Sequence, residues 1–258
     1  MDIKYFKHIS SILDIFWRKI NEEKTRRKMK IIKIPFSGAN LGRNEGCEKA
    51  PEEIVKALNK VYLGENFKSA DFDIDLVKVD KSNIDTSLEK IYKKAKDIKT
   101  GIFIGGDHSI TYSCFKAFSE KSNKPGLIVF DAHADSEVTT KSVTHEDFIR
   151  KLIEDKILKP ENLILVGLRN FTNKEISFLI QNKIKFFDMK KIFEDLENVC
   201  DTIMELARNF DSLYISIDID VVDPSAAPGT GCLEPAGLSA RELVYFIQRL
   251  KLLKNLKI

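Results

Sequence analysis

The sequence has few cysteines and no paired cysteine motif. Its four cysteines are far apart and form no C-x-x-C pair; they are Cys47, Cys114, Cys200 and Cys232. This spacing is typical of an intracellular chain with reduced, unpaired thiols, so we expect a cytoplasmic protein.

Long apolar runs and an excess of one charge are also missing. No stretch approaches the roughly 20 apolar residues that span a bilayer, and the first residues lack an uninterrupted apolar stretch before a small-residue cleavage site. The formal net charge is only +3, with 42 Lys and Arg interleaved among 39 Asp and Glu. Nucleic-acid-binding proteins usually carry a strongly basic face. We therefore expect no membrane span, no secretion signal and no nucleic-acid partner.

From Met29 onward, short strand patterns alternate with helical patterns. Apolar runs such as "GLIVF" and "NLILVG" are continuous, which is typical of strands covered on both faces. The predicted strands are 30–34, 73–79, 101–105, 126–131, 162–167, 184–188 and 212–218. The predicted helices are 51–60, 86–98, 108–120, 145–156, 174–182 and 189–209. In a chain of 258 residues, this alternation favours one α/β domain with a parallel sheet between helices.

The first 28 residues are distinct from this pattern. Ile3, Phe6, Ile9 and Ile12 recur at helical spacing, which predicts one amphipathic helix. We expect residues 1–28 to be a helical extension of a 29–258 domain that makes a packing or oligomer contact. A membrane-surface or partner-binding helix is the alternative.

Acidic and histidine residues follow three of the predicted strands. The segments are "GIFIGGDHSI", "LIVFDAHADS" and "LYISIDIDVVDPSAAPG", and the residues are Asp107, His108, Asp131, His133, Asp135, Asp218, Asp220 and Asp223. Ligands of parallel sheets bind beyond the carboxyl ends of strands, and side chains two apart in an extended chain share a face. We expect most of this set to converge, although Asp107 fits a helix N-cap equally well and Asp223 fits a turn.

Such a cluster would be costly without a cation, because neighbouring carboxylates raise one another's pKa and resist burial. Two divalent ions would offset the charge of four aspartates and would be ligated by two neutral imidazoles. An oxygen-rich ligand set without thiolates favours Mn²⁺ over a structural Zn²⁺ site.

The segments "GGDHS", "DAHAD" and "SIDIDVVDPSAAPGTG" resemble the three signature segments of the ureohydrolase family of arginases and agmatinases. The likeness runs in the same order from about Met29 to the C-terminus. It implies an arginase-like three-layer α/β/α sandwich around an eight-stranded, mostly parallel sheet, assembled as a homotrimer or homohexamer. It also implies two Mn²⁺ ions per subunit, with the ligands His108, Asp131, His133, Asp135, Asp218 and Asp220.

The resemblance implies hydrolysis of a small guanidino compound to urea and an amine. His145, in "SVTHEDFIRKL", resembles the family's proton-shuttling histidine, with a helix-start histidine as the alternative. Glu234 lies in "GTGCLEPAGLS", which resembles the agmatinase type more than the arginase type, so agmatine is the first expected substrate and arginine or formimidoylglutamate follow. We expect Glu234 and the entrance residues Thr139, Thr140 and Ser142 to contact the substrate.

The sequence departs from the family at "KNLKI", where the resemblance places a last strand with a glutamate that pairs with the substrate guanidinium. No residue matches that glutamate, so we expect the 29–258 domain to be C-terminally truncated. A catalytically silent metal-binding scaffold or oligomer partner is the alternative function. A related deacetylase is disfavoured, because such enzymes use one Zn²⁺ and adjacent histidines that are absent here.

The segment "VGLRN" follows a predicted strand. Its Arg169 and Asn170 are expected either at the site or in structural pairing.

Overall fold

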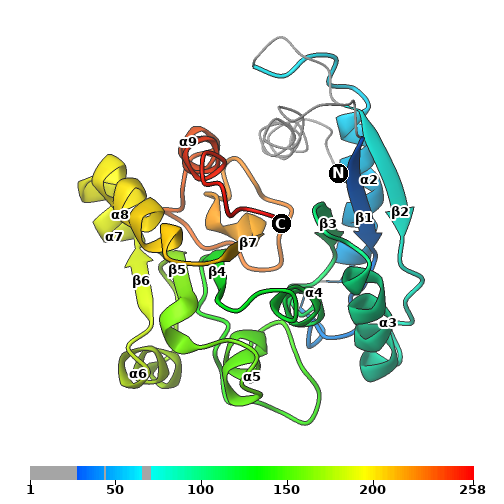
Figure 1. Ribbon diagram of the computed structural model, residues 1–258, viewed down its shortest axis with the longest axis horizontal. Helices are drawn as coiled ribbons and strands as arrows, with labels where there is room; N and C mark the ends of the chain where they lie inside the picture. Colours follow the sequence, from blue (N-terminus) through cyan, green and yellow to red (C-terminus); the bar gives the residue numbers. More distant parts are fainter. Residues whose placement is uncertain (1–27, 44, 66–70) are drawn as a thin grey trace.

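The computed structural model of the chain describes residues 28–43, 45–65 and 71–258. Within these ranges, seven parallel strands form two sheets (Figure 1). The strands are β1 (Met29–Ile34), β2 (Phe72–Leu76), β3 (Ile102–Gly105), β4 (Pro125–Phe130), β5 (Leu163–Leu168), β6 (Lys185–Asp188) and β7 (Ser212–Ile217). The predicted helix and extension over 1–28 lie outside the described residues, apart from Lys28.

The order of strands is β2-β1-β3 in one sheet and β6-β5-β4-β7 in the other. All pairings are parallel, so the carboxyl ends of the strands in each sheet lie at one edge. This topology confirms the predicted α/β class with parallel strands, in which β4 and β7 end side by side. Two metal-ligand segments predicted from the sequence follow these two neighbouring strands.

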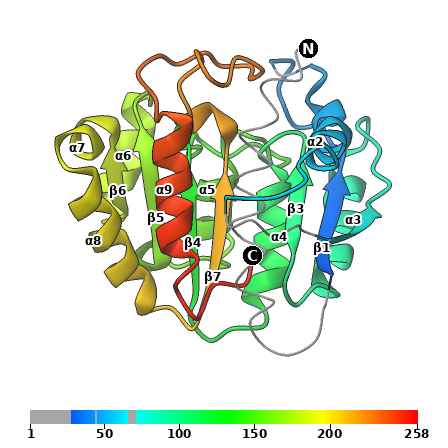
Figure 2. The same cartoon turned by 90° about the horizontal axis from the view of Figure 1, so that it is seen from above.

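Helices cover both faces of the strands and give three layers (Figure 2). The helices α3 (Ile84–Lys96), α4 (Ile110–Ser119), α5 (Phe148–Glu154) and α6 (Asn173–Gln181) cover one face. The other carries α2 (Ala50–Leu58), α7 (Met189–Glu194), α8 (Leu196–Arg208) and α9 (Ala240–Leu250). Short 3₁₀ helices lie at Cys47–Lys49 (η1), Pro160–Asn162 (η2) and Ile219–Val221 (η3).

The strand β4 shows why its apolar run is continuous. Leu127 and Val129 belong to the core under α3 to α6, whereas Ile128 and Phe130 belong to the core under α8 and α9. Each of these four residues has no exposed surface. Because alternate side chains enter opposite cores, both faces of the strand are apolar.

The helix predictions differ from the structure in two places. The predicted helix over 189–209 is split at Asp195, whose side chain accepts from the backbone N–H of Asn198 and begins α8. The helix α9 was not predicted, although Ser239 and Glu242 form a capping box in front of a strongly amphipathic segment. The capping box and the apolar spacing after it were the signals available in the sequence.

The last described residues run along the free edge of β7. Leu213 donates to the carbonyl of Asn255, Lys257 donates to Leu213, and Ile215 donates to Ile258, at 2.7 to 3.0 Å. No described strand joins β7 to β3, so the described strands form two sheets rather than the single sheet implied by the resemblance. A cavity of about 1900 Å³ extends from the strand ends into the space between β3 and β7. Within the described residues, no helix has the length and apolarity to cross a membrane.

Candidate metal centre and active site

His108 is placed by the tight turn that leaves β3. A Cβ atom on Gly106 would lie 2.0 Å from the carbonyl oxygen of Phe36, so only glycine allows the two backbones to approach this closely. The N–H of Asp107 then donates to the same Phe36 carbonyl at 2.8 Å. This packing of the 36–40 loop against the turn directs the buried His108 side chain toward the ends of β4 and β7.

The second segment, after β4, is not extended throughout. Asp131 accepts a hydrogen bond from the N–H of His133 at 2.7 Å, and Asp135 has a φ of 43°. The left-handed conformation of Asp135 bends the chain. The sequence predicted that alternation along an extended chain would bring the Asp135 carboxylate into the cluster. In the structure, a turn brings it to His108.

The third segment, after β7, also turns. Asp218 caps the 3₁₀ helix η3 and its side chain accepts from the N–H of Asp220 at 3.1 Å. Asp220 in turn accepts from the N–H of Ala132 at 3.1 Å, which joins this segment to the one after β4. The predicted strand ends one residue earlier than expected, but both carboxylates still face the cluster.

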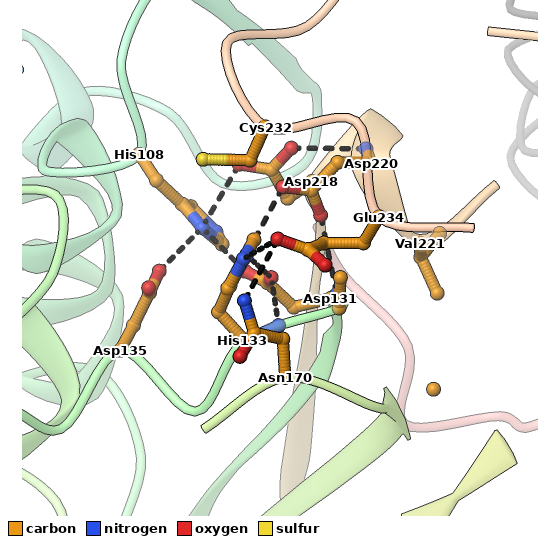
Figure 3. Close-up of polar contacts among 12 residues, drawn as sticks. His108, Asp131, His133, Asp135, Asn170, Asp218, Asp220, Val221, Cys232 and Glu234 are labelled. Atoms are coloured by element: carbon orange, nitrogen blue, oxygen red, sulfur yellow. Dashed lines mark hydrogen bonds and ion pairs between the residues drawn. The ribbon is translucent and has the colours of Figure 1, made fainter. Parts of the chain in front are cut away.

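The structure brings all six expected ligands together (Figure 3). The Nδ1 atom of His108 lies 3.0 Å from carboxylate oxygens of Asp131 and Asp135 and 3.4 Å from Asp218. The Nδ1 atom of His133 lies 3.1 Å from Asp220 and 3.4 Å from Asp131. Two groups with the spacing of metal ligands result, His108–Asp131–Asp218 and Asp131–His133–Asp220, and Asp131 belongs to both.

The cluster of carboxylates and imidazoles is better suited to hold cations than to exist without them. Burial and the charge of Asp131 raise the pKa of Asp135, and burial and Asp218 raise the pKa of Asp220 to about 8. Nδ1 of His108 and Oδ2 of Asp131 are buried and lie 3.0 Å apart, but neither forms a hydrogen bond of normal geometry among the described residues. Unpaired buried polar atoms and repelling carboxylates are both relieved when a cation binds between them.

The far nitrogens of the two histidines have different partners. Nε2 of His108 lies 2.9 Å from the hydroxyl of Ser216, which also contacts Thr111 at 3.0 Å. A hydrogen bond at Nε2 orients the ring and leaves Nδ1 for the cluster. Nε2 of His133 faces the carboxylate of Glu234 at 3.6 Å. Sequence reasoning missed Ser216, although its position two residues before Asp218 places it on the same face of β7.

His145 lies before α5 in the lining of the same cavity. Its backbone N–H donates to the Ala39 carbonyl at 3.1 Å, while its Nε2 atom is buried without a hydrogen-bond partner. Burial lowers the pKa of the imidazole, although Glu146 and Asp107 oppose this effect. Burial therefore disfavours the protonated, charged form of the ring.

Asp107, Thr139 and Thr140 have different hydrogen-bond partners in the structure. Asp107 precedes Ser109, the N-cap of α4, and its carboxylate accepts from the N–H of Ser109 at 3.1 Å and from the N–H of Ala39 at 3.0 Å. The hydroxyl of Thr139 donates to Glu154 and that of Thr140 to the Ser142 carbonyl, both at 2.8 Å.

The loop that carries these hydroxyls does not reach the cavity wall. The lining passes from Val138 to His145, so Thr139, Thr140 and Ser142 lie outside it. Glu234, by contrast, lines the cavity beside His133. Among the four expected substrate contacts, only Glu234 borders the metal-ligand cluster.

Comparison with known proteins identifies the family of the chain. The model of the arginase family matches residues 27–258. An uncharacterised 32.2 kDa protein of Methanothermus fervidus is 32% identical over 181 residues, covering 69% of this chain and 61% of that protein. An arginase of Staphylococcus aureus is 28% identical over 260 residues, covering 86% of each. The solved formimidoylglutamase of Bacillus subtilis superposes with a TM-score of 0.78 at 25% identity, covering 86% of this chain and 74% of that one.

Proposed function

This chain belongs to the arginase family of manganese-dependent hydrolases of linear amidines, and on that premise we propose that it cleaves a guanidino compound to urea and an amine. We propose two Mn²⁺ ions per subunit, held by His108, Asp131, His133, Asp135, Asp218 and Asp220. Bound divalent ions supply Lewis acidity and lower the pKa of water toward neutrality.

The position of Asp131 is the observation that carries this proposal. Its two carboxylate oxygens lie 3.0 Å from His108 and 3.4 Å from His133, so it stands between the two ligand groups. Its side chain is 2% exposed. A buried carboxylate shared by two ligand groups is suited to hold two cations at one centre.

Residues of the protein itself would transfer a proton to the leaving amine and bind the substrate. We assign proton transfer to the leaving amine to His145, because it lines the cavity and its buried Nε2 has no other partner. We assign a contact with the substrate cation to Glu234, whose carboxylate borders His133. Thr139, Thr140 and Ser142 would support the loop at the entrance rather than touch the reacting group.

The cavity wall favours a substrate with a second positive charge. Besides the metal-ligand cluster, its lining holds more acidic residues, among them Glu137, Glu146 and Glu234, than basic ones. The basic residues are Lys49, Lys257 and Arg43, and Arg43 is paired with Glu146. An excess of carboxylates attracts an ammonium group and repels the α-carboxylate of an amino acid. Agmatine, a guanidine with a distal ammonium group, therefore remains our first substrate. Arginine and formimidoylglutamate are the alternatives.

A product assay tests the proposal. We expect the Mn²⁺-loaded protein to release urea from agmatine faster than from arginine, and faster than formamide from formimidoylglutamate. Asp131→Asn should abolish release from all three. Two bound Mn²⁺ ions without product from any substrate would instead support the catalytically silent scaffold. Light scattering of the purified protein tests the homotrimer or homohexamer that we propose with this function.

A further inference from the structure

The Arg169 side chain donates several hydrogen bonds to backbone carbonyls beside the site. It follows β5, and its half-buried guanidinium donates to the carbonyls of Asp220 at 2.6 Å, Glu234 at 2.8 Å and Pro235 at 3.0 Å. Two longer bonds of 3.4 Å reach Gly167 and Val221. Arginine has five N–H donors in a rigid fork and no acceptor, so this set of carbonyls uses its full hydrogen-bonding capacity.

Apart from Gly167 in β5 itself, the carbonyls belong to two segments, which are also joined further along the chain by backbone hydrogen bonds from Leu238 to Val221 and from Asp223 to Leu238. One is the turn that carries the proposed ligand Asp220, and the other is the loop that carries Glu234. Within the described part of the chain, the hydrogen bonds that join residues 228–235 to the rest of the protein are donated by Arg169 and its neighbour Asn170. Most of that loop is exposed, so it has little packing of its own.

Asn170 binds the side chain of Glu234. Its Nδ2 atom donates to Oε1 of Glu234 at 2.7 Å, and the same oxygen lies 3.6 Å from His133. Arg169 therefore fixes the backbone of Glu234, while Asn170 fixes its carboxylate. Figure 3 shows the Asn170 and Glu234 side chains beside His133. The guanidinium of Arg169 bonds to carbonyls and not to the carboxylate, so it does not compete with a cationic substrate for Glu234.

We propose that Arg169 is a positioning residue that holds the Glu234 loop against the Asp220 turn and so sets the distance between the Glu234 carboxylate and the metal-ligand cluster. It acts through Glu234 and does not touch the substrate. A lysine has one nitrogen in place of the fork and cannot bond to both segments in the same way. The kinetic part of this inference rests on the proposed function, whereas the loop-anchoring part does not.

Loop anchoring is tested by proteolysis of the full chain. Thermolysin cleaves before bulky apolar residues, and Leu233 is exposed in the loop. We expect cleavage at Leu233 to be about tenfold faster in Arg169→Gln than in the wild type, and intermediate in Arg169→Lys. Arg150→Gln is the matched control, because Arg150 bonds to Glu154 on α5 and stacks on Phe178, away from the loop. Equal cleavage of wild type, Arg169→Gln and Arg150→Gln would overturn the proposal.

A double-mutant cycle tests whether Arg169 acts through Glu234. We expect Arg169→Gln and Glu234→Gln each to raise the KM for agmatine by about 10- to 100-fold, the range for a lost bond to a charged group, with a smaller change in kcat. The double variant should be no worse than the poorer single variant, and Mn²⁺ content should stay at two per chain in all of them. Multiplying KM effects would refute the coupling. A wild type without urea release would refute the proposed function alone, since proteolysis still decides whether Arg169 anchors the loop.

Discussion

Replacing Asp131 with asparagine tests the metal centre through the stability of the fold. Asp131 belongs to both ligand groups, so its neutral isostere removes the shared negative charge without leaving a void. A ligand that binds only the folded state stabilises it by about 2.7 kcal/mol when its free concentration is 100-fold above Kd. Two such sites contribute about 5 kcal/mol. For a domain of this size, about 2–4 °C per kcal/mol gives a rise in Tm of about 10–20 °C.

The measurement is calorimetry of metal-stripped protein titrated with Mn²⁺, followed by metal analysis after gel filtration. We expect the wild type to bind two ions and to show this rise, and Asp131→Asn to lose most of it. Asp85→Asn is the matched control, because Asp85 is exposed in the first turn of α3, and it should retain the full rise. No rise in the wild type, or an equal rise in Asp131→Asn, would refute the reasoning, as would one tightly held Zn²⁺ ion.

Three further predictions concern residues around the centre. His145→Ala should retain two Mn²⁺ ions and lower kcat by about 10²–10⁴-fold, the usual loss of a general acid; an unchanged rate between pH 6 and 9 would leave His145 without a catalytic role. Burial lowers the pKa of His145 in the folded protein. Just below pH 6.5, the ordinary pKa of the group, the unfolded chain therefore binds more protons than the folded protein. Wild-type stability should therefore fall with decreasing pH in that window more steeply than that of His145→Gln, as measured by urea unfolding of metal-stripped protein. Gly106→Ala should lower the free energy of unfolding by about 1–3 kcal/mol or more, because its Cβ meets the Phe36 carbonyl; an unchanged Tm would contradict this.

Much of the fold followed from local patterns. Each of the seven strands lies within two or three residues of its predicted range, because apolar runs such as "GLIVF" report burial on both faces without reference to the rest of the chain. The convergence of the segments after β4 and β7 was also predictable, since neighbouring parallel strands end at a common edge, whereas His108 follows β3 of the other sheet. The helix α9 was missed although its capping box is a local signal.

The tertiary structure decided how those residues meet. The sequence predicted alternation for Asp135, but a left-handed turn brings its carboxylate to His108. The sequence left Asp107 and Arg169 open, because their partners, Ala39 for one and the carbonyls of Glu234 and Asp220 for the other, are about 50 to 70 residues away. A repeating pattern determines which face of a strand or helix is buried, whereas the partners of a polar group depend on how separate loops pack. Only the folded chain fixes that packing.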